Sequence, residues 1–200
     1  MKKTIEFIYD FGSPNAYLAY KLLPEIAANL DVSIMFNPCL LGGIFKATNN
    51  QSPFYAYAPI KGKLAYEQLE MRRFIEKHSI PFEFNPNFPI NTLLIMRGAM
   101  VAKRDGILEG YTSAVFNLMW KQPRKMDDPE IVKTALTEAG FDGASIVDAT
   151  KDPAIKAALI SNTESVVERG VFGMPTFFVG EEMYYGKDRL DQVAEAVKRG

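Results

Sequence analysis

The sequence predicts an α/β chain in which a βαβ unit near the start and a ββα unit near the end share one small mixed sheet, with an all-helical segment inserted between them. Three observations predict this class. Runs of β-branched and aromatic residues occur only near the two ends of the chain, a helical apolar repeat separates the first two runs, and every repeat between residues 62 and 169 is helical. The expected boundaries are 1–40 and 170–200 for a discontinuous α/β domain and 41–169 for an inserted helical domain.

The first 38 residues predict the βαβ unit. Residues 4–9 (TIEFIY) are apolar on both faces, which is typical of a buried strand. Ser13 then stands at an N-cap position and Pro14 at the first helical position, where its missing N–H costs nothing. Residues 32–36 predict a second strand, ended by an Asn-Pro pair. We expect the crossover between the two parallel strands to be right-handed.

The middle of the chain predicts loops followed by helices. Residues 40–61 are rich in glycine, asparagine and proline, which indicates a loop. Residues 81–89 (PFEFNPNFP) also predict irregular structure. Helical repeats fall in residues 63–78, 92–103, 108–121, 129–139 and 153–169.

Strand signals return only near the end. Residues 176–179 and 182–185 flank a Gly-Glu pair and predict a tight hairpin. Residues 188–198 predict a last helix with Asp188 as its N-cap.

Composition excludes several classes of function. The 200 residues are 48% hydrophobic and 24% charged, which excludes a disordered chain. The formal charge of −1 gives no net field that would favour nucleic acid or an anionic membrane, although a local patch is compatible with it. Glu6 interrupts the apolar stretch that a secretory signal needs. We therefore expect a soluble cytoplasmic protein.

The rarest residues constrain the chemistry most. Cys39 is the single cysteine, so an internal disulfide or dithiol redox pair is excluded and a reducing compartment is expected. His78 is the single histidine, so a zinc site of cysteines and histidines is excluded, and we expect no metal. If the chain is an enzyme, its reactive group is borrowed from another molecule.

Three blocks carry a family resemblance. Residues 10–19 (DFGSPNAYLA), 173–180 (GMPTFFVG) and 185–190 (YGKDRL) resemble the kappa-class glutathione transferases and their bacterial isomerase relatives. These proteins form part of the DsbA-like branch of the thioredoxin-like fold. The resemblance implies glutathione as cofactor and, as activity, the cis–trans isomerisation of 2-hydroxychromene-2-carboxylate, or a similar aromatic hemiketal acid, to trans-o-hydroxybenzylidenepyruvate in aromatic-hydrocarbon degradation. It also implies a homodimer.

Ser13 occupies the position where a dithiol oxidoreductase of this fold has its reactive cysteine. A serine hydroxyl can donate a hydrogen bond to the thiolate of bound glutathione, and the helix N-terminus adds to its stabilisation. An ordinary N-cap is the alternative role. The two roles are compatible, because a helix N-terminus also favours anions.

Further site residues follow from the resemblance. The backbone of Met174, before a cis-proline, pairs with the cysteinyl unit of glutathione, and the start of the last helix binds the γ-glutamyl unit, unless Asp188 is only a cap. Asn50 matches a position that contacts glutathione, and its alternative role is that of a turn residue. Lys46 would pair with the substrate carboxylate, and its alternative role is that of an ordinary surface lysine. The implied glutathione-binding residues are Ser13, Asn50, Met174, Gly186, Lys187 and Asp188, and the implied substrate-binding residues are Lys46, Asn87 and Phe88.

Two other functions remain open at this point. A kappa-like transferase or peroxidase would consume glutathione, whereas an isomerase would regenerate it. A non-catalytic carrier would bind small aromatic acids without turnover.

Overall fold

The four strands form one mixed sheet, as the sequence predicts. The computed structural model describes residues 3–199, so residues 1, 2 and 200, which the expected domain boundaries include, lie outside the described residues. The strand order is β2-β1-β3-β4, with β1 parallel to β2, β1 antiparallel to β3, and β3 antiparallel to β4. The strands are β1 (Thr4–Tyr9), β2 (Ser33–Pro38), β3 (Thr176–Val179) and β4 (Glu182–Tyr185).

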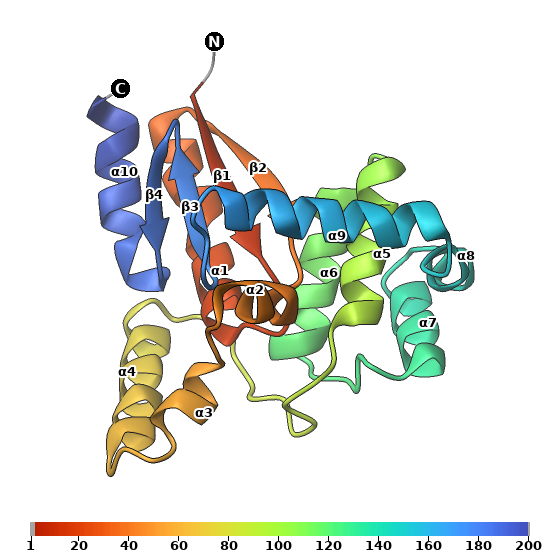
Figure 1. Cartoon of the computed structure of the whole chain (residues 1–200), viewed down its shortest axis with the longest axis horizontal. Helices are drawn as coiled ribbons and strands as arrows, with labels where there is room; N and C mark the ends of the chain where they lie inside the picture. Colours follow the sequence, from red (N-terminus) through yellow and green to blue (C-terminus); the bar gives the residue numbers. More distant parts are fainter. Residues whose placement is uncertain (1–2, 200) are drawn as a thin grey trace.

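Helices cover both faces of this sheet (Figure 1). Helices α1 (Pro14–Leu30) and α10 (Leu190–Arg199) pack together on one face, and α9 (Pro153–Glu168) crosses the other. Because side chains alternate along a strand, Phe7 packs into the larger core on the α1 side, whereas Ile8 packs with residues of α9.

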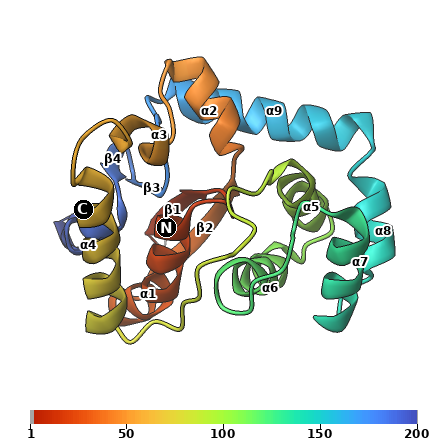
Figure 2. The same ribbon diagram turned by 90° about the horizontal axis from the view of Figure 1, so that it is seen from below.

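All the helices predicted between residues 62 and 169 are confirmed, and no strand occurs in this described segment. Helices α5 and α6 pack against each other, and α7 packs against a short α8 (Figure 2). The division into two domains at residues 40 and 170 stays a prediction. The helices of this segment other than α9 are α4 (Lys63–Lys77), α5 (Leu93–Arg104), α6 (Leu108–Trp120), α7 (Pro129–Glu138) and α8 (Gly143–Ala149).

Three details differ from the sequence prediction. The expected loop over residues 40–61 is wrong, because α2 (Leu41–Thr48) and α3 (Pro53–Tyr57) form there; α8 was also not predicted. Two glycines weaken the local helix signal in α2, but Ile44 is buried against α9 and supplies the missing stabilisation. Asp188 is not an N-cap: it lies inside a 3₁₀ turn, Lys187–Arg189, that precedes α10.

Trp120 joins the helical segment to the loop after β1. Its side chain is fully buried. The indole stacks on Phe82 at 5.8 Å between ring centroids, and its Nε1–H donates to the carbonyl of Phe11 at 2.8 Å. The loop that carries Ser13 is therefore fixed from the helical side as well as from the sheet.

Helices α3 and α4 stand away from the sheet (Figures 1 and 2). Neither helix has a buried residue. Large apolar side chains of this region are exposed: Phe54, Tyr55, Ile60 and Tyr66. Within residues 3–199, every helix is too short or too polar to cross a bilayer.

Candidate functional site

Ser13 lies at the junction of β1 and α1. Its backbone is extended (φ −94°, ψ 110°), and its Oγ accepts a hydrogen bond from the N–H of Ala16 at 3.2 Å, so the predicted N-cap is confirmed. The hydroxyl donates to the carbonyl of Met174 at 3.4 Å. A bond of this length lies beyond the usual range, so the proton can turn to a better acceptor at little cost.

The loop of residues 172–175 lies beside Ser13. Its Met174-Pro175 bond is cis, as the resemblance implies. The side chain of Asn50 donates to the carbonyl of Phe172 at 2.8 Å, and the N–H of Gly186 donates to the carbonyl of Pro175 at 2.9 Å. This loop therefore brings Ser13, Asn50 and Gly186 together, although they are far apart in the sequence.

The backbone of this loop offers a free donor at Met174. Among the described residues, the N–H of Met174 has no hydrogen-bond acceptor, and its carbonyl accepts only the long bond from Ser13. A Cβ at Gly173 would lie 2.9 Å from the ring of Tyr185, so glycine lets this ring close over the loop. A free N–H beside a weakly occupied carbonyl can pair with the backbone of an extended peptide.

Lys187 and Asp188 form a zwitterionic pair next to the loop. The ammonium of Lys187 lies 3.0 Å and 3.1 Å from the two carboxylate oxygens of Asp188. The same ammonium lies 4.9 Å from the ring centroid of Phe74 on α4, and the lysine stem is buried. The pair presents both charges that an amino-acid zwitterion needs as partners.

Asp10 supports the site from below and was not singled out by the sequence analysis. Its buried carboxylate accepts from the N–H groups of Gly12 and Leu41, both at 2.8 Å, and from the hydroxyl of Thr92. It thereby ties the Ser13 loop to the starts of α2 and α5. An acidic residue directly after a buried strand was the available signal.

Burial raises the pKa of Asp10 above its ordinary value of 3.8, despite the three donors. Since the folded-state pKa exceeds the unfolded one, the stability that Asp10 contributes is present below about pH 3.8 and is lost as the pH rises through the folded value. We therefore expect the free energy of unfolding of the wild type to fall relative to that of Asp10→Asn as the pH rises from about 3.8 through the folded-state pKa. Urea titrations at a series of pH values measure it. A shift in favour of the wild type would contradict the raised pKa.

Cys39 is fully buried behind α9, and burial raises the pKa of its thiol. Because the thiolate is the reactive form, we expect no reaction of the folded protein with Ellman's reagent. One thiol per chain should react after denaturation. Rapid labelling of the folded protein would show that the chain has a reactive thiol of its own.

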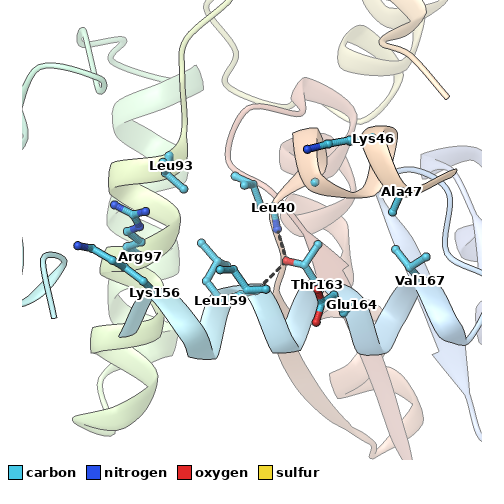
Figure 3. Close-up of a pocket in the computed structure, with 12 residues that line it drawn as sticks. Leu40, Lys46, Ala47, Leu93, Arg97, Lys156, Leu159, Thr163, Glu164 and Val167 are labelled. Carbon is cyan, nitrogen blue, oxygen red and sulfur yellow. Dashed lines mark hydrogen bonds between the residues drawn. The ribbon is translucent and has the colours of Figure 1, made fainter. Parts of the chain in front are cut away.

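The three predicted substrate residues have different surroundings in the structure. Lys46 lines a cavity of about 390 Å³ between α2, α5 and α9 (Figure 3). Asn87 instead donates its side-chain N–H to Asn85 at 3.3 Å, and the ring of Phe88 lies 5.8 Å from that of Trp120. No hydrogen bond, ion pair or ring contact among the described residues joins Lys46 to the other two, so their shared role stays a prediction.

Comparison with known proteins gives consistent results. A family model described as a DSBA-like thioredoxin domain matches residues 4–198. A 2-hydroxychromene-2-carboxylate isomerase of Pseudomonas sp. (strain C18) is 30% identical over 196 residues, covering 96% of this chain and 89% of that protein. Glutathione S-transferase kappa 1 of Homo sapiens is 23% identical, covering 97% and 90%. A solved 2-hydroxychromene-2-carboxylate isomerase superposes with a TM-score of 0.85 at 28% identity, covering 98% and 95%.

Proposed function

The chain belongs to the DSBA-like thioredoxin domain family, and we propose that this member is a glutathione-dependent isomerase of 2-hydroxychromene-2-carboxylate or a similar aromatic hemiketal acid. The isomerases that it resembles over nearly their whole length support this reaction class. We place its work in the cytoplasm, where glutathione is kept reduced.

The observation that carries the proposal is the arrangement around residues 172–175. The free N–H of Met174, the nearby hydroxyl of Ser13 and the Lys187–Asp188 pair fit the three parts of an extended thiol peptide with a zwitterionic end. The rings of Tyr185 and Phe172 are tilted against each other, with 4.6 Å between their centroids, and they flank this side of the loop.

The chain's own residues have defined tasks in the reaction. When bound, glutathione supplies a thiolate whose reversible addition makes a carbon–carbon double bond single, so that it can rotate. Ser13 turns its hydroxyl from the Met174 carbonyl toward the sulfur and stabilises the negative charge. Met174 orients the cysteinyl unit, and Lys187 and Asp188 hold the carboxylate and ammonium of the γ-glutamyl unit. No protein base is needed for the addition, because the thiol of bound glutathione would release its proton to solvent beforehand.

Calorimetric titration with glutathione tests the proposal. We expect binding to wild type and roughly tenfold weaker binding to Asp188→Asn, because one charge-assisted hydrogen bond contributes at least about 1.5 kcal/mol. Asp191→Asn, an exposed carboxylate one turn further along, is the matched control and should bind as wild type does. Equal affinities for all three proteins, or no binding at millimolar glutathione, would contradict it.

The stoichiometry of free thiol separates the isomerase from its rivals. Total free thiol stays constant during turnover by an isomerase and falls during turnover by a transferase or peroxidase. A carrier gives no turnover at all.

We also propose that α3 and α4 form the contact of a homodimer. A 15-residue helix with no buried residue is marginal in water, and four large apolar side chains are exposed on it or on the segment before it. Light scattering should give the mass of a dimer for wild type and of a monomer for Phe54→Glu. Ile107→Glu, an exposed apolar position outside this surface, should remain a dimer. A monomeric wild type would contradict the proposal.

A further inference from the structure

The cavity that Lys46 lines is a site of its own. It lies between α2, α5 and α9 and has a volume of about 390 Å³ (Figure 3). None of the residues assigned above to glutathione lines it. Its apolar wall comes from three different segments, and its main members are Leu40, Leu93, Leu159 and Val167.

Three cationic side chains and one carboxylate line the same cavity. Lys46, Arg97 and Lys156 each come from a different helix, and Glu164 is the single acidic lining residue. None of the four makes an ion pair with any residue between 3 and 199. The cavity therefore has a formal surplus of two positive charges that the described protein does not neutralise.

Arg97 gives the strongest sign of a missing ligand. Its Nε is buried from solvent and has no hydrogen-bond partner among the described residues. A buried donor without an acceptor is costly, and a guanidinium offers paired N–H groups that match a carboxylate. Figure 3 shows Arg97 and Lys156 close together at one end of the cavity, whereas Lys46 lies on α2, on the other side of Leu40.

We propose that this cavity binds a small aromatic carboxylate. The carboxylate lies on Arg97 and Lys156, with Lys46 adding long-range attraction, and one or two aromatic rings lie against the leucines and Val167. The volume falls within the range of small-molecule sites, which run from about 300 to 1,000 Å³ and are mostly apolar with few polar groups. The inference rests on the charges and shape of this cavity and stands apart from the glutathione site.

Titration of the whole chain with 2-naphthoate, measured by calorimetry, tests the proposal. We expect wild type to bind 2-naphthoate and Arg97→Gln to bind it roughly 10- to 150-fold more weakly. Naphthalene-2-carboxamide has no charge, so wild type should bind this amide about as weakly as Arg97→Gln binds the acid. Arg104→Gln, an exposed arginine of the same helix, is the matched control and should bind as wild type does. Equal affinity of Arg97→Gln and wild type for 2-naphthoate would overturn the proposal, as would equal affinity of wild type for the acid and the amide.

Two further arms identify the natural ligand and keep the two sites distinct. Arg97→Gln should bind glutathione with wild-type affinity, which shows that it is folded; a failure of glutathione binding in wild type leaves the naphthoate result intact. If 2-naphthoate inhibits turnover competitively with the aromatic substrate, the cavity receives the substrate's own carboxylate. If it leaves the KM unchanged, the cavity holds a second aromatic acid. Either result requires binding at Arg97, and the absence of binding refutes both.

Discussion

We expect the replacement of Ser13 with alanine to lower the turnover number roughly 10- to 150-fold and to leave glutathione bound. A hydrogen bond to a charged group contributes roughly 1.5–3 kcal/mol, and each ~1.36 kcal/mol changes the rate about tenfold. The other contacts proposed for glutathione, at Met174 and at the Lys187–Asp188 pair, do not involve the hydroxyl. The pKa of the bound thiol should rise by about one to two units, which the ultraviolet absorbance of its thiolate measures.

The control for this variant separates catalysis from helix capping. Ser13→Ala also removes an N-cap, at a cost of typically ~1 kcal/mol of stability. Asp128→Ala removes the N-cap of α7, where the carboxylate accepts from the N–H of Glu130 at 3.0 Å. Both variants should lose similar stability, but only Ser13→Ala should lose turnover. Equal losses of turnover in Ser13→Ala and Asp128→Ala would show that Ser13 acts only as a helix N-cap.

We expect the replacement of Trp120 with alanine to lower the free energy of unfolding by about 3–5 kcal/mol. The indole is fully buried, stacks on Phe82 and contacts Phe84 and Phe88. Its removal opens a cavity between the irregular segment of residues 81–89 and α6. Chemical denaturation monitored by circular dichroism measures the loss.

Trp120→Phe separates the packing of this ring from its hydrogen bond. Phenylalanine keeps an aromatic ring and removes the donor to Phe11, so the carbonyl of Phe11 is left buried without its partner at a cost of about 1–3 kcal/mol. Because Phe11 lies two residues before Ser13, turnover should also fall. A variant with wild-type stability and turnover would show that the bond to Phe11 does not position the loop.

The elements with strong local signals could be predicted from the sequence. Strand β1 is rich in β-branched and aromatic residues on both faces, α1 begins with a Ser-Pro pair, and the β3–β4 hairpin surrounds a glycine turn. Helix α2 could not be predicted, because its glycines favour a loop and its stability comes from contacts with α9 and from the Asp10 carboxylate at its first turn. Tertiary packing there overrides local propensity.

The candidate site divides in the same way. The blocks around Ser13, Met174 and Asp188 were visible as sequence motifs, and the structure brings their chain segments to one loop. Asp10 and Arg97 were missed, because their importance lies in burial and in the partners they have or lack. A single charged residue in a sequence indicates neither property.

The central claim is that this chain provides the binding site while a borrowed thiol does the bond-making. The most direct test measures the rate at which 2-hydroxychromene-2-carboxylate is converted, with and without reduced glutathione. The absorbance of the open-chain product monitors this rate. We expect turnover only when the thiol is present, with its concentration unchanged at the end and with no activity from S-methylglutathione. The same rate in the absence of any added thiol would contradict the claim.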